Sequence, residues 1–200
     1  MVKALLEFIL KKTKVHLAVI VLPWGKYLKK QIVKIKTANI RRFSPMSFNP
    51  NAKISGPYVN SVLAHLEARK AGYDEALLLT QQGFVAEGSG ENIFIVRNGV
   101  LCTPPLGNIL PGITRNAVIQ IAKDLKIRAR EKKFHLKDCY KADECFLTGT
   151  AAEVTPVGKI DKKIINNGNI GPVTLRVKTY FEEIVKGERK AYKKWLTYVQ

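Results

Sequence analysis

The sequence predicts an α+β domain in which helices flank a mixed or antiparallel sheet, and three observations support this class. The chain has 200 residues, of which 46% are hydrophobic, so it can bury the core of one ordinary domain. Short strand-like and helix-like segments follow one another without the regular alternation of a parallel α/β fold. No apolar run reaches the roughly 18 residues that a membrane span needs, so we expect no membrane partner.

The first part of the chain predicts two strands and a loop. Residues 3–12 form a basic amphipathic segment, and residues 15–22 are apolar, rich in β-branched side chains and followed by Pro23. These features indicate a short buried strand. Residues 31–39 alternate in polarity like a second strand, whereas residues 41–53 carry two prolines and two asparagines and are typical of a loop.

A helix is predicted over residues 55–73. Ser55 is a candidate cap, Pro57 suits the first turn, and Gly72 supplies the stop. Apolar side chains recur at the i, i+3, i+4 and i+7 spacing of a helix face, so we expect that face to pack inward. Its members are Val59, Val62, Leu63 and Leu66.

The remaining elements are short strands followed by helices. Asn98-Gly99 is a hairpin signal of the two-residue kind, and it divides residues 92–104 into two strands. Further strands are predicted over residues 75–80, 84–88, 127–136, 142–150 and 152–160, and helical segments within 109–127, 137–142, 172–187 and 190–199.

Charge and cysteine content narrow the classes of function. Lys and Arg number 34 against 16 Asp and Glu, a formal charge of +18, but the bases are spread along the chain without interleaved aromatics. This favours a generally basic surface over a dedicated nucleic-acid face. The three cysteines, Cys102, Cys139 and Cys145, lack CxxC spacing, which argues against a disulfide framework or a metal site. Buried or spare thiols in a reducing cytoplasm are the simpler interpretation.

Three glycine-containing segments could offer backbone amides to an anion. LPGIT begins a helix, so the amides of Ile113 and Thr114 would point outward at its positive end, with the Thr114 hydroxyl beside them. GTAAE places Gly149 and Thr150 where a strand enters a turn, and EGSGEN is the third such place. Each alone is explained by a capped helix or a plain turn, but together they indicate a ligand that carries phosphate.

Lys53 stands apart from the other lysines by its position. It lies at the end of a loop, just before the start of a helix and with few charged neighbours in sequence. A lysine held beside a phosphate pocket suits Schiff-base chemistry, whereas a solvated loop lysine is the alternative that spacing alone favours.

Four motifs in order give the chain a family resemblance: residues 52–80, 83–105, 109–115 (ILPGITR) and 142–157 (ADECFLTGTAAEVTPV). They resemble the class IV aminotransferases, which are pyridoxal-phosphate enzymes of fold type IV, from about residue 15 to the C-terminus. The forms GENIF and GTAAEVTPV are most similar to the branched-chain amino acid aminotransferases. D-amino acid aminotransferase and aminodeoxychorismate lyase are the alternatives within the group.

The resemblance implies a role for each matching residue. Lys53 would form the Schiff base with pyridoxal 5'-phosphate and shuttle the proton, Tyr58 would bind the phenolate oxygen of the cofactor, and Glu87 would pair with its pyridine nitrogen. Ile113, Thr114 and Thr150 would hold the phosphate. Trp24 and Tyr27 would close over the substrate, and Gly149, Thr150 and Ala151 would face its carboxylate. No catalytic role falls to Glu91.

The resemblance also implies a domain plan and partners. Residues 1–22 would be a remnant of a small N-terminal domain, 23–30 an interdomain loop, and 31–200 the large cofactor-binding domain, with a mixed sheet or pseudo-barrel. The resemblance also implies amino acid and 2-oxo acid substrates, a homodimer or larger homo-oligomer, and a cytoplasmic location. Because only about fourteen residues precede the first predicted strand, a truncated, inactive remnant is a further alternative.

Overall fold

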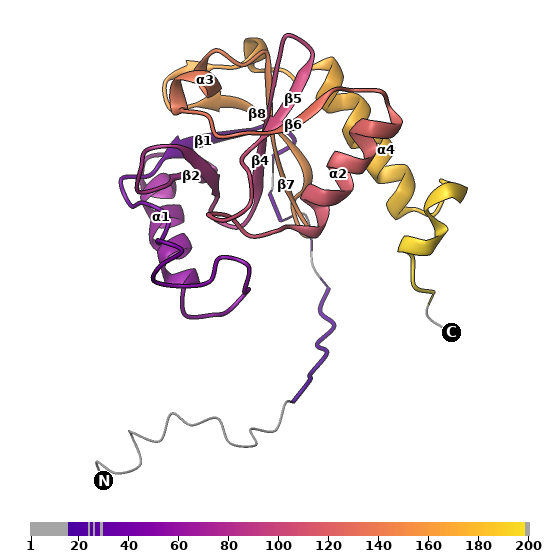
Figure 1. Ribbon diagram of the computed structural model, residues 1–200, viewed down its shortest axis with the longest axis horizontal. Helices are drawn as coiled ribbons and strands as arrows, with labels where there is room; N and C mark the ends of the chain where they lie inside the picture. Colours follow the sequence, from indigo (N-terminus) through magenta and orange to yellow (C-terminus); the bar gives the residue numbers. More distant parts are fainter. Residues whose placement is uncertain (1–15, 24, 26, 29, 199–200) are drawn as a thin grey trace.

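A single mixed sheet with helices on both sides organises the chain (Figure 1). The computed structural model describes residues 16–23, 25, 27–28 and 30–198. The strands are β1 (Val33–Thr37), β2 (Glu75–Leu79), β3 (Val85–Gly88), β4 (Asn92–Arg97), β5 (Val100–Thr103), β6 (Ala129–Glu131), β7 (Glu144–Gly149), β8 (Glu153–Ile160) and β9 (Lys163–Ile164). The helices are α1 (Tyr58–Lys70), α2 (Ile113–Asp124), α3 (Leu136–Tyr140) and α4 (Pro172–Val185), with 3₁₀ turns η2 (Asn166–Gly168) and η3 (Lys190–Trp195).

The sheet runs in the order β3-β2-β1-β8-β7-β4-β5-β6, with β9 added to β8. β1 pairs in parallel with β2 and β8, and β5 with β6, whereas the other pairs are antiparallel. The two ends of this order approach each other, because Phe84 bridges His135 and the amide of Val85 donates to the carbonyl of Phe134 at 2.9 Å. The sheet is therefore curled, and the predicted α+β class with helices around a mixed sheet is confirmed.

Alternation along the strands divides the core between the two faces of the sheet. Ile93 and Ile95 point to the concave side, where they meet residues such as Ile35, Leu77 and Leu147. The opposite side chains form a second cluster in which Phe94 stacks on Phe146 at 5.1 Å, and α2 and α4 cover it. The period-2 pattern of a strand buried on both faces thus explains the nearly continuous apolar runs in β4 and β7.

A buried carboxylate fixes the start of α4. Oε1 and Oε2 of Glu144 accept hydrogen bonds from the amides of Val173 and Thr174 at 3.0 and 2.7 Å. A Cβ on Gly171 would collide with this carboxylate, so only glycine fits there. The negative charge at the positive end of the helix stabilises α4 against the sheet.

Helix α1 packs through its small residues, which corrects the predicted inward face. Ser61, Ala64 and Ala68 are buried, and the alanines pack with Ala38, Ala76 and Leu78. The predicted face is exposed instead: Val59, Val62, Leu63 and Leu66 are 61, 53, 48 and 48% exposed. Small side chains let the helix lie close to β2, and the larger apolar ones are rotated away from the sheet.

The ends of α1 also refine the prediction. Its N-cap is Pro57 and no side-chain hydrogen bond caps it, so the proposed Ser55 cap was wrong; only the carbonyl of Ser55 takes part, accepting from Tyr58 N at 3.1 Å. The stop at Gly72 is confirmed, because its φ is +79° and its amide donates back to Arg69. The Asn98-Gly99 turn is confirmed as well, with φ of 49° and 71°.

Other predicted elements differ in extent. Residues 16–22 are exposed and have no strand pairing in the described part of the chain, so the buried strand predicted over 15–22 was wrong for them; Val15 and the segment 3–12 lie outside the described residues. The strand within 127–136 shortens to β6, the last helix is the 3₁₀ turn η3, and β9 was missed because two residues carry no pattern.

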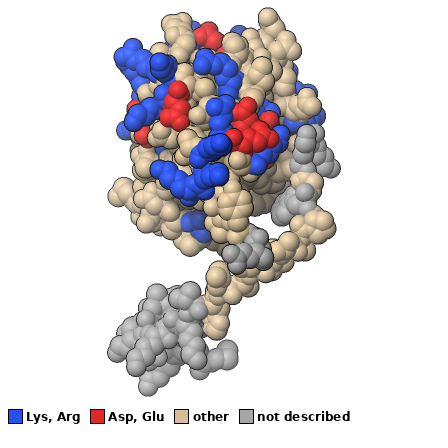
Figure 2. All heavy atoms as spheres, turned by 90° about the vertical axis from the view of Figure 1, so that its right-hand side faces the viewer, with Lys and Arg blue, Asp and Glu red and all other residues tan. Residues whose placement is uncertain are grey.

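The surface charge is dispersed over the face that Figure 2 shows, where Lys and Arg side chains are interspersed with acidic and uncharged ones. All three cysteines are free and buried, as predicted. None of the helices within the described residues is long and apolar enough to cross a membrane. The same residues contain no cluster of three or more His, Cys, Asp or Glu side chains that could hold a metal ion.

Candidate functional site

A pocket of about 270 Å³ lies where the loop before α1, the turn after β3, the start of α2 and the turn after β7 converge. Three of these segments are the glycine-containing ones that the sequence singled out. Of the ten predicted site residues, seven line this pocket: Lys53, Tyr58, Glu87, Ile113, Thr114, Gly149 and Thr150. Segments nearly 100 residues apart are thus brought to one place.

Lys53 is held between a turn and a helix start. The amide of Ala52 donates to the carbonyl of Asn49 at 3.1 Å, and the amide of Asn51 donates to Oδ1 of Asn49 at 3.0 Å. Tyr58 follows as the first residue of α1. The lysine is exposed and lines the pocket, so its amine is accessible to a ligand there.

Glu87 is the buried acid at the end of β3, with 5% of its surface exposed. Its Oε2 accepts hydrogen bonds from Leu110 N and from Nδ2 of Asn92, each at 3.1 Å. Its Oε1 lies 2.8 Å from Nη2 of Arg42, yet no well-aligned hydrogen bond reaches it. Burial raises the pKa of Glu87 to about 7, although Arg42, the Leu110 amide and Arg115 favour the ionised form.

The unsatisfied Oε1 tests whether a pyridine ring suits this pocket. Arg42 lies 2.8 Å from this oxygen without an aligned hydrogen bond, so the oxygen can still accept one from a ligand, and a buried acceptor gains free energy when it does. A protonated ring nitrogen is a suitable donor, and a cation there would also favour the ionised carboxyl. The pocket therefore fits a flat ring with a protonated nitrogen.

Asn92 connects the acid to the start of α2. Its Nδ2 also donates to the carbonyl of Leu110 at 2.9 Å, so it joins β4 to the segment before the helix. A Cβ on Gly112 would collide with Oδ1 of Asn92, which leaves room only for glycine at this approach. The backbone before α2 is consequently held against the pocket wall.

The amino end of α2 faces the pocket. The helix begins at Ile113 with Gly112 as its N-cap, and no side chain of the described residues caps it. The contrast with α4 is informative, since there the buried Glu144 fills the corresponding position. Positive helix ends attract anions, so an uncapped one beside the Thr114 hydroxyl is suited to a phosphate.

The turn between β7 and β8 contributes residues 150–152. Gly149 and Thr150 line the pocket, whereas Ala151 lines a neighbouring groove that also contains Tyr27. A Cβ on Gly90 would lie 3.4 Å from Oη of Tyr27, so this tyrosine borders the turn after β3 without lining the main pocket. Trp24 lies outside the described residues.

The sequence did not reveal two residues that shape the site. Arg42 is only 8% exposed, stacks on Phe43 at 4.0 Å and faces Glu87, but nothing distinguishes it among 34 basic residues. Asn92 lies in the GENIF motif, which by itself indicates only the subfamily. Its position one residue after a turn that bears two acids was the available signal.

Comparison with known proteins gives one family. The family model described as amino-transferase class IV matches residues 7–160. A protein of Aquifex aeolicus named probable branched-chain-amino-acid aminotransferase is 48% identical over 185 residues, which cover 91% of this chain and 60% of that protein. The chain thus spans about three fifths of the length of such relatives.

Solved structures agree with this result. The branched-chain aminotransferase of Thermoproteus uzoniensis with norvaline has a TM-score of 0.85 and 47% identity, covering 88% of this chain and 59% of the other. The branched-chain amino acid aminotransferase from Thermobaculum terrenum in its PLP-form has a TM-score of 0.81 and 38% identity, covering 83% of this chain and 55% of the other.

Proposed function

Since this chain belongs to the class IV aminotransferases, we propose that it moves the amino group between a branched-chain amino acid (leucine, isoleucine or valine) and 2-oxoglutarate, with pyridoxal 5'-phosphate as cofactor. The observation that carries the proposal is the shared pocket, in which an accessible lysine, a buried acid whose Oε1 accepts no aligned hydrogen bond and an uncapped helix end meet. The names of its relatives support the branched-chain substrate over a D-amino acid or aminodeoxychorismate.

The residues of the pocket divide into cofactor and substrate roles. Glu87 would bind the ring nitrogen, Tyr58 the phenolate oxygen, and the amides of Ile113 and Thr114, with Thr150, the phosphate. When bound, the cofactor supplies an electron sink for cleavage at the amino acid Cα. Lys53 would hold the cofactor covalently and, once released, take up and return the substrate proton at its Nζ.

The substrate would lie between the β7–β8 turn and the segment 23–30. Backbone amides of Gly149, Thr150 and Ala151 are suited to a carboxylate, and Trp24 and Tyr27 to the aliphatic side chain. In this plan residues 31–200 are the cofactor-binding domain and residues 1–22 belong to a small domain. Burial and nearby Glu91, Glu75 and Tyr58 raise the pKa of Tyr27 to about 12, so its hydroxyl is neutral at working pH.

We further propose a homo-oligomer in the cytoplasm. The exposed apolar face of α1, formed by Val59, Val62, Leu63 and Leu66, is a candidate for burial against a second copy. The free, buried cysteines suit a reducing compartment. Sedimentation of the native protein beside a Val62→Ser/Leu66→Ser variant would test the interface, because a dimer held by this face should dissociate in the variant.

Glutamate production from leucine and 2-oxoglutarate tests the proposed activity. We expect turnover that needs added pyridoxal phosphate, falls to background in Lys53→Ala, and persists in Lys141→Ala, which alters an exposed lysine elsewhere. Activity with D-alanine or aminodeoxychorismate but not leucine would contradict the substrate assignment. Cofactor binding without any turnover would identify the chain as an inactive cofactor-binding unit, and restored activity after joining a relative's small domain would support that alternative.

A further inference from the structure

The proposed mechanism leaves two further buried carboxyl groups unused, and one of them lies in the pocket wall. Glu75 on β2 is 0% exposed and Glu91, in the turn after β3, is 3% exposed. Glu91 also belongs to the pocket wall. Isolated buried charges are costly, so the location of any negative charge on this pair matters for the pocket.

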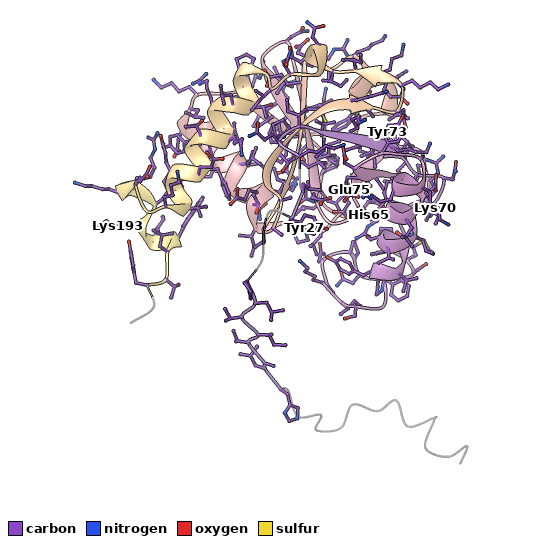
Figure 3. All side chains as sticks on the ribbon, turned by 180° about the vertical axis from the view of Figure 1, so that it is seen from behind. Tyr27, His65, Lys70, Tyr73, Glu75 and Lys193 are labelled. Atoms are coloured by element: carbon purple, nitrogen blue, oxygen red, sulfur yellow. The ribbon has the colours of Figure 1, made fainter. Side chains whose placement is uncertain are left out.

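Glu75 has donors for a negative charge. The amide of Ala76 donates to its Oε1 at 2.6 Å, and Nδ1 of His65 lies 3.1 Å from each carboxylate oxygen. An ionised carboxylate only accepts, so this contact suits an ionised Glu75 when Nδ1 of His65 carries the proton. Figure 3 shows His65 and Glu75 next to each other, with Tyr27 nearby.

His65 also connects Glu75 to solvent. Its side chain is 35% exposed and lines a groove together with Tyr27, Lys30, Arg69 and Asp74. The pair therefore extends from the interior of the sheet to a solvent-accessible groove on the side of α1.

Glu91 has fewer hydrogen-bond donors than Glu75 to stabilise a negative charge. Only the amide of Gly90 donates to it, at 3.2 Å to Oε2, and its enclosed Oε1 has no hydrogen-bond partner in the described chain. Burial, and then the neighbouring Glu75, raise the pKa of Glu91 to about 8, and Glu87 adds to the effect. Of the two carboxyl groups, Glu75 therefore has the better hydrogen-bond support.

The position of Glu91 relates it to the substrate end of the pocket. A Cβ on Gly149 would lie 3.6 Å from Cγ of Glu91 and 3.5 Å from the carbonyl of Gly90. Glu91 therefore packs against the turn to which we assign the substrate carboxylate. An ionised Glu91 would repel an anionic substrate there, whereas a neutral one would not.

We propose that Glu91 is a specificity-determining residue that stays protonated, so that the substrate end of the pocket carries no negative charge, whereas the hydrogen-bond donors of this region, Ala76 N and His65 Nδ1, face Glu75 instead. The binding role rests on the proposed function, but the protonation state does not. Ionisable groups around the pair are Glu87 on β3, Tyr58 and His65 on α1, Tyr27 before β1, and Lys53 and Arg42 of the same pocket.

The pH dependence of unfolding tests the protonation. In the unfolded chain Glu91 ionises near 4.5, and in the folded protein near 8, so the folded state binds the extra proton between these values. The unfolding constant of the native protein should therefore rise about tenfold per pH unit relative to Glu91→Gln over this window. Glu188→Gln, at an exposed position, is the control, and the ratio of its unfolding constant to that of the native protein should not change with pH over this window. A constant ratio for Glu91→Gln would overturn the proposal.

Binding of 4-methylvalerate, a branched carboxylate that cannot react, tests the role in the pocket. Calorimetry on the cofactor-loaded native protein should give affinity about tenfold weaker at pH 9 than at pH 7, and a smaller change for Glu91→Gln. Identical pH profiles for native protein and Glu91→Gln would overturn the binding role. No binding by any variant, with the unfolding ratio intact, would overturn the proposed substrate and leave the protonation established.

Discussion

Replacing Arg42 with methionine should raise the pKa of Glu87 and leave it neutral at working pH. Nη2 of Arg42 lies 2.8 Å from Oε1 of Glu87, with side-chain exposures of 10 and 6%. At an effective dielectric constant of about 20 their attraction is about 6 kcal/mol, of which desolvation cancels a large part. A neighbouring opposite charge typically shifts a carboxyl pKa by about 1–3 units. We therefore expect a rise from about 7 to between about 8 and 10.

Urea unfolding across pH 5–10 measures this shift. The folded-state pKa of Glu87 is raised above its unfolded value of 4.5, so its contribution to the free energy of unfolding falls as pH rises, by about 1.4 kcal/mol per unit, until the folded-state pKa is reached. The difference in free energy of unfolding between the native protein and Glu87→Gln should become independent of pH above about pH 7. The corresponding difference in free energy of unfolding between Arg42→Met and Arg42→Met/Glu87→Gln should become independent of pH about 1–3 pH units higher. Ser61→Ala, which removes only a 3.4 Å contact of Arg42, is the control. If both differences level off at the same pH, Arg42 does not set the charge of Glu87.

Three other substitutions test the geometry. Asn92→Ala removes the donor to Glu87 and Leu110, and should lower the free energy of unfolding by about 1–3 kcal/mol in urea; no change would show that water replaces it. Gly112→Ala should weaken pyridoxal-phosphate binding in a fluorescence titration, because its Cβ collides with Asn92, whereas Gly56→Ala, with open space around it, should bind like the native protein. Ala64→Val should lower the free energy of unfolding by about 1–3 kcal/mol, because the larger side chain overpacks against β2. Val62→Ala on the exposed side should lower it by less than about 0.5 kcal/mol. A larger loss for Val62→Ala than for Ala64→Val would support the helix face that the sequence predicted.

The sequence predicted correctly those turns and helix ends whose conformation depends only on residues within the turn or helix end itself. The Asn98-Gly99 turn and the stop at Gly72 follow from backbone conformations that glycine and asparagine favour. The inward face of α1 does not follow from spacing, because alanines at 64 and 68 and the larger apolar residues both recur with helical periodicity. The close approach of β2 selects the small ones, and that is a tertiary effect.

In the candidate site, too, residues that are placed by tertiary packing could not be selected from local sequence patterns. Lys53, Glu87 and the start of α2 were predicted from a family resemblance and from turn chemistry, and the curled sheet brings them to one pocket. Arg42, 45 residues before Glu87, could not be selected from the sequence, because its role depends on the loop after β1 folding over β3. The pairing of Glu75 with His65 across α1 and β2 is likewise invisible until the helix is docked.

Covalent mapping of bound cofactor tests the central claim most directly. The protein would be incubated with pyridoxal phosphate, reduced with borohydride, digested and examined by mass spectrometry, with the native protein beside Lys53→Ala. We expect one stoichiometric adduct on the peptide that contains Lys53, and its loss in the variant. An adduct spread over surface lysines, or unchanged in Lys53→Ala, would contradict the assignment of this pocket.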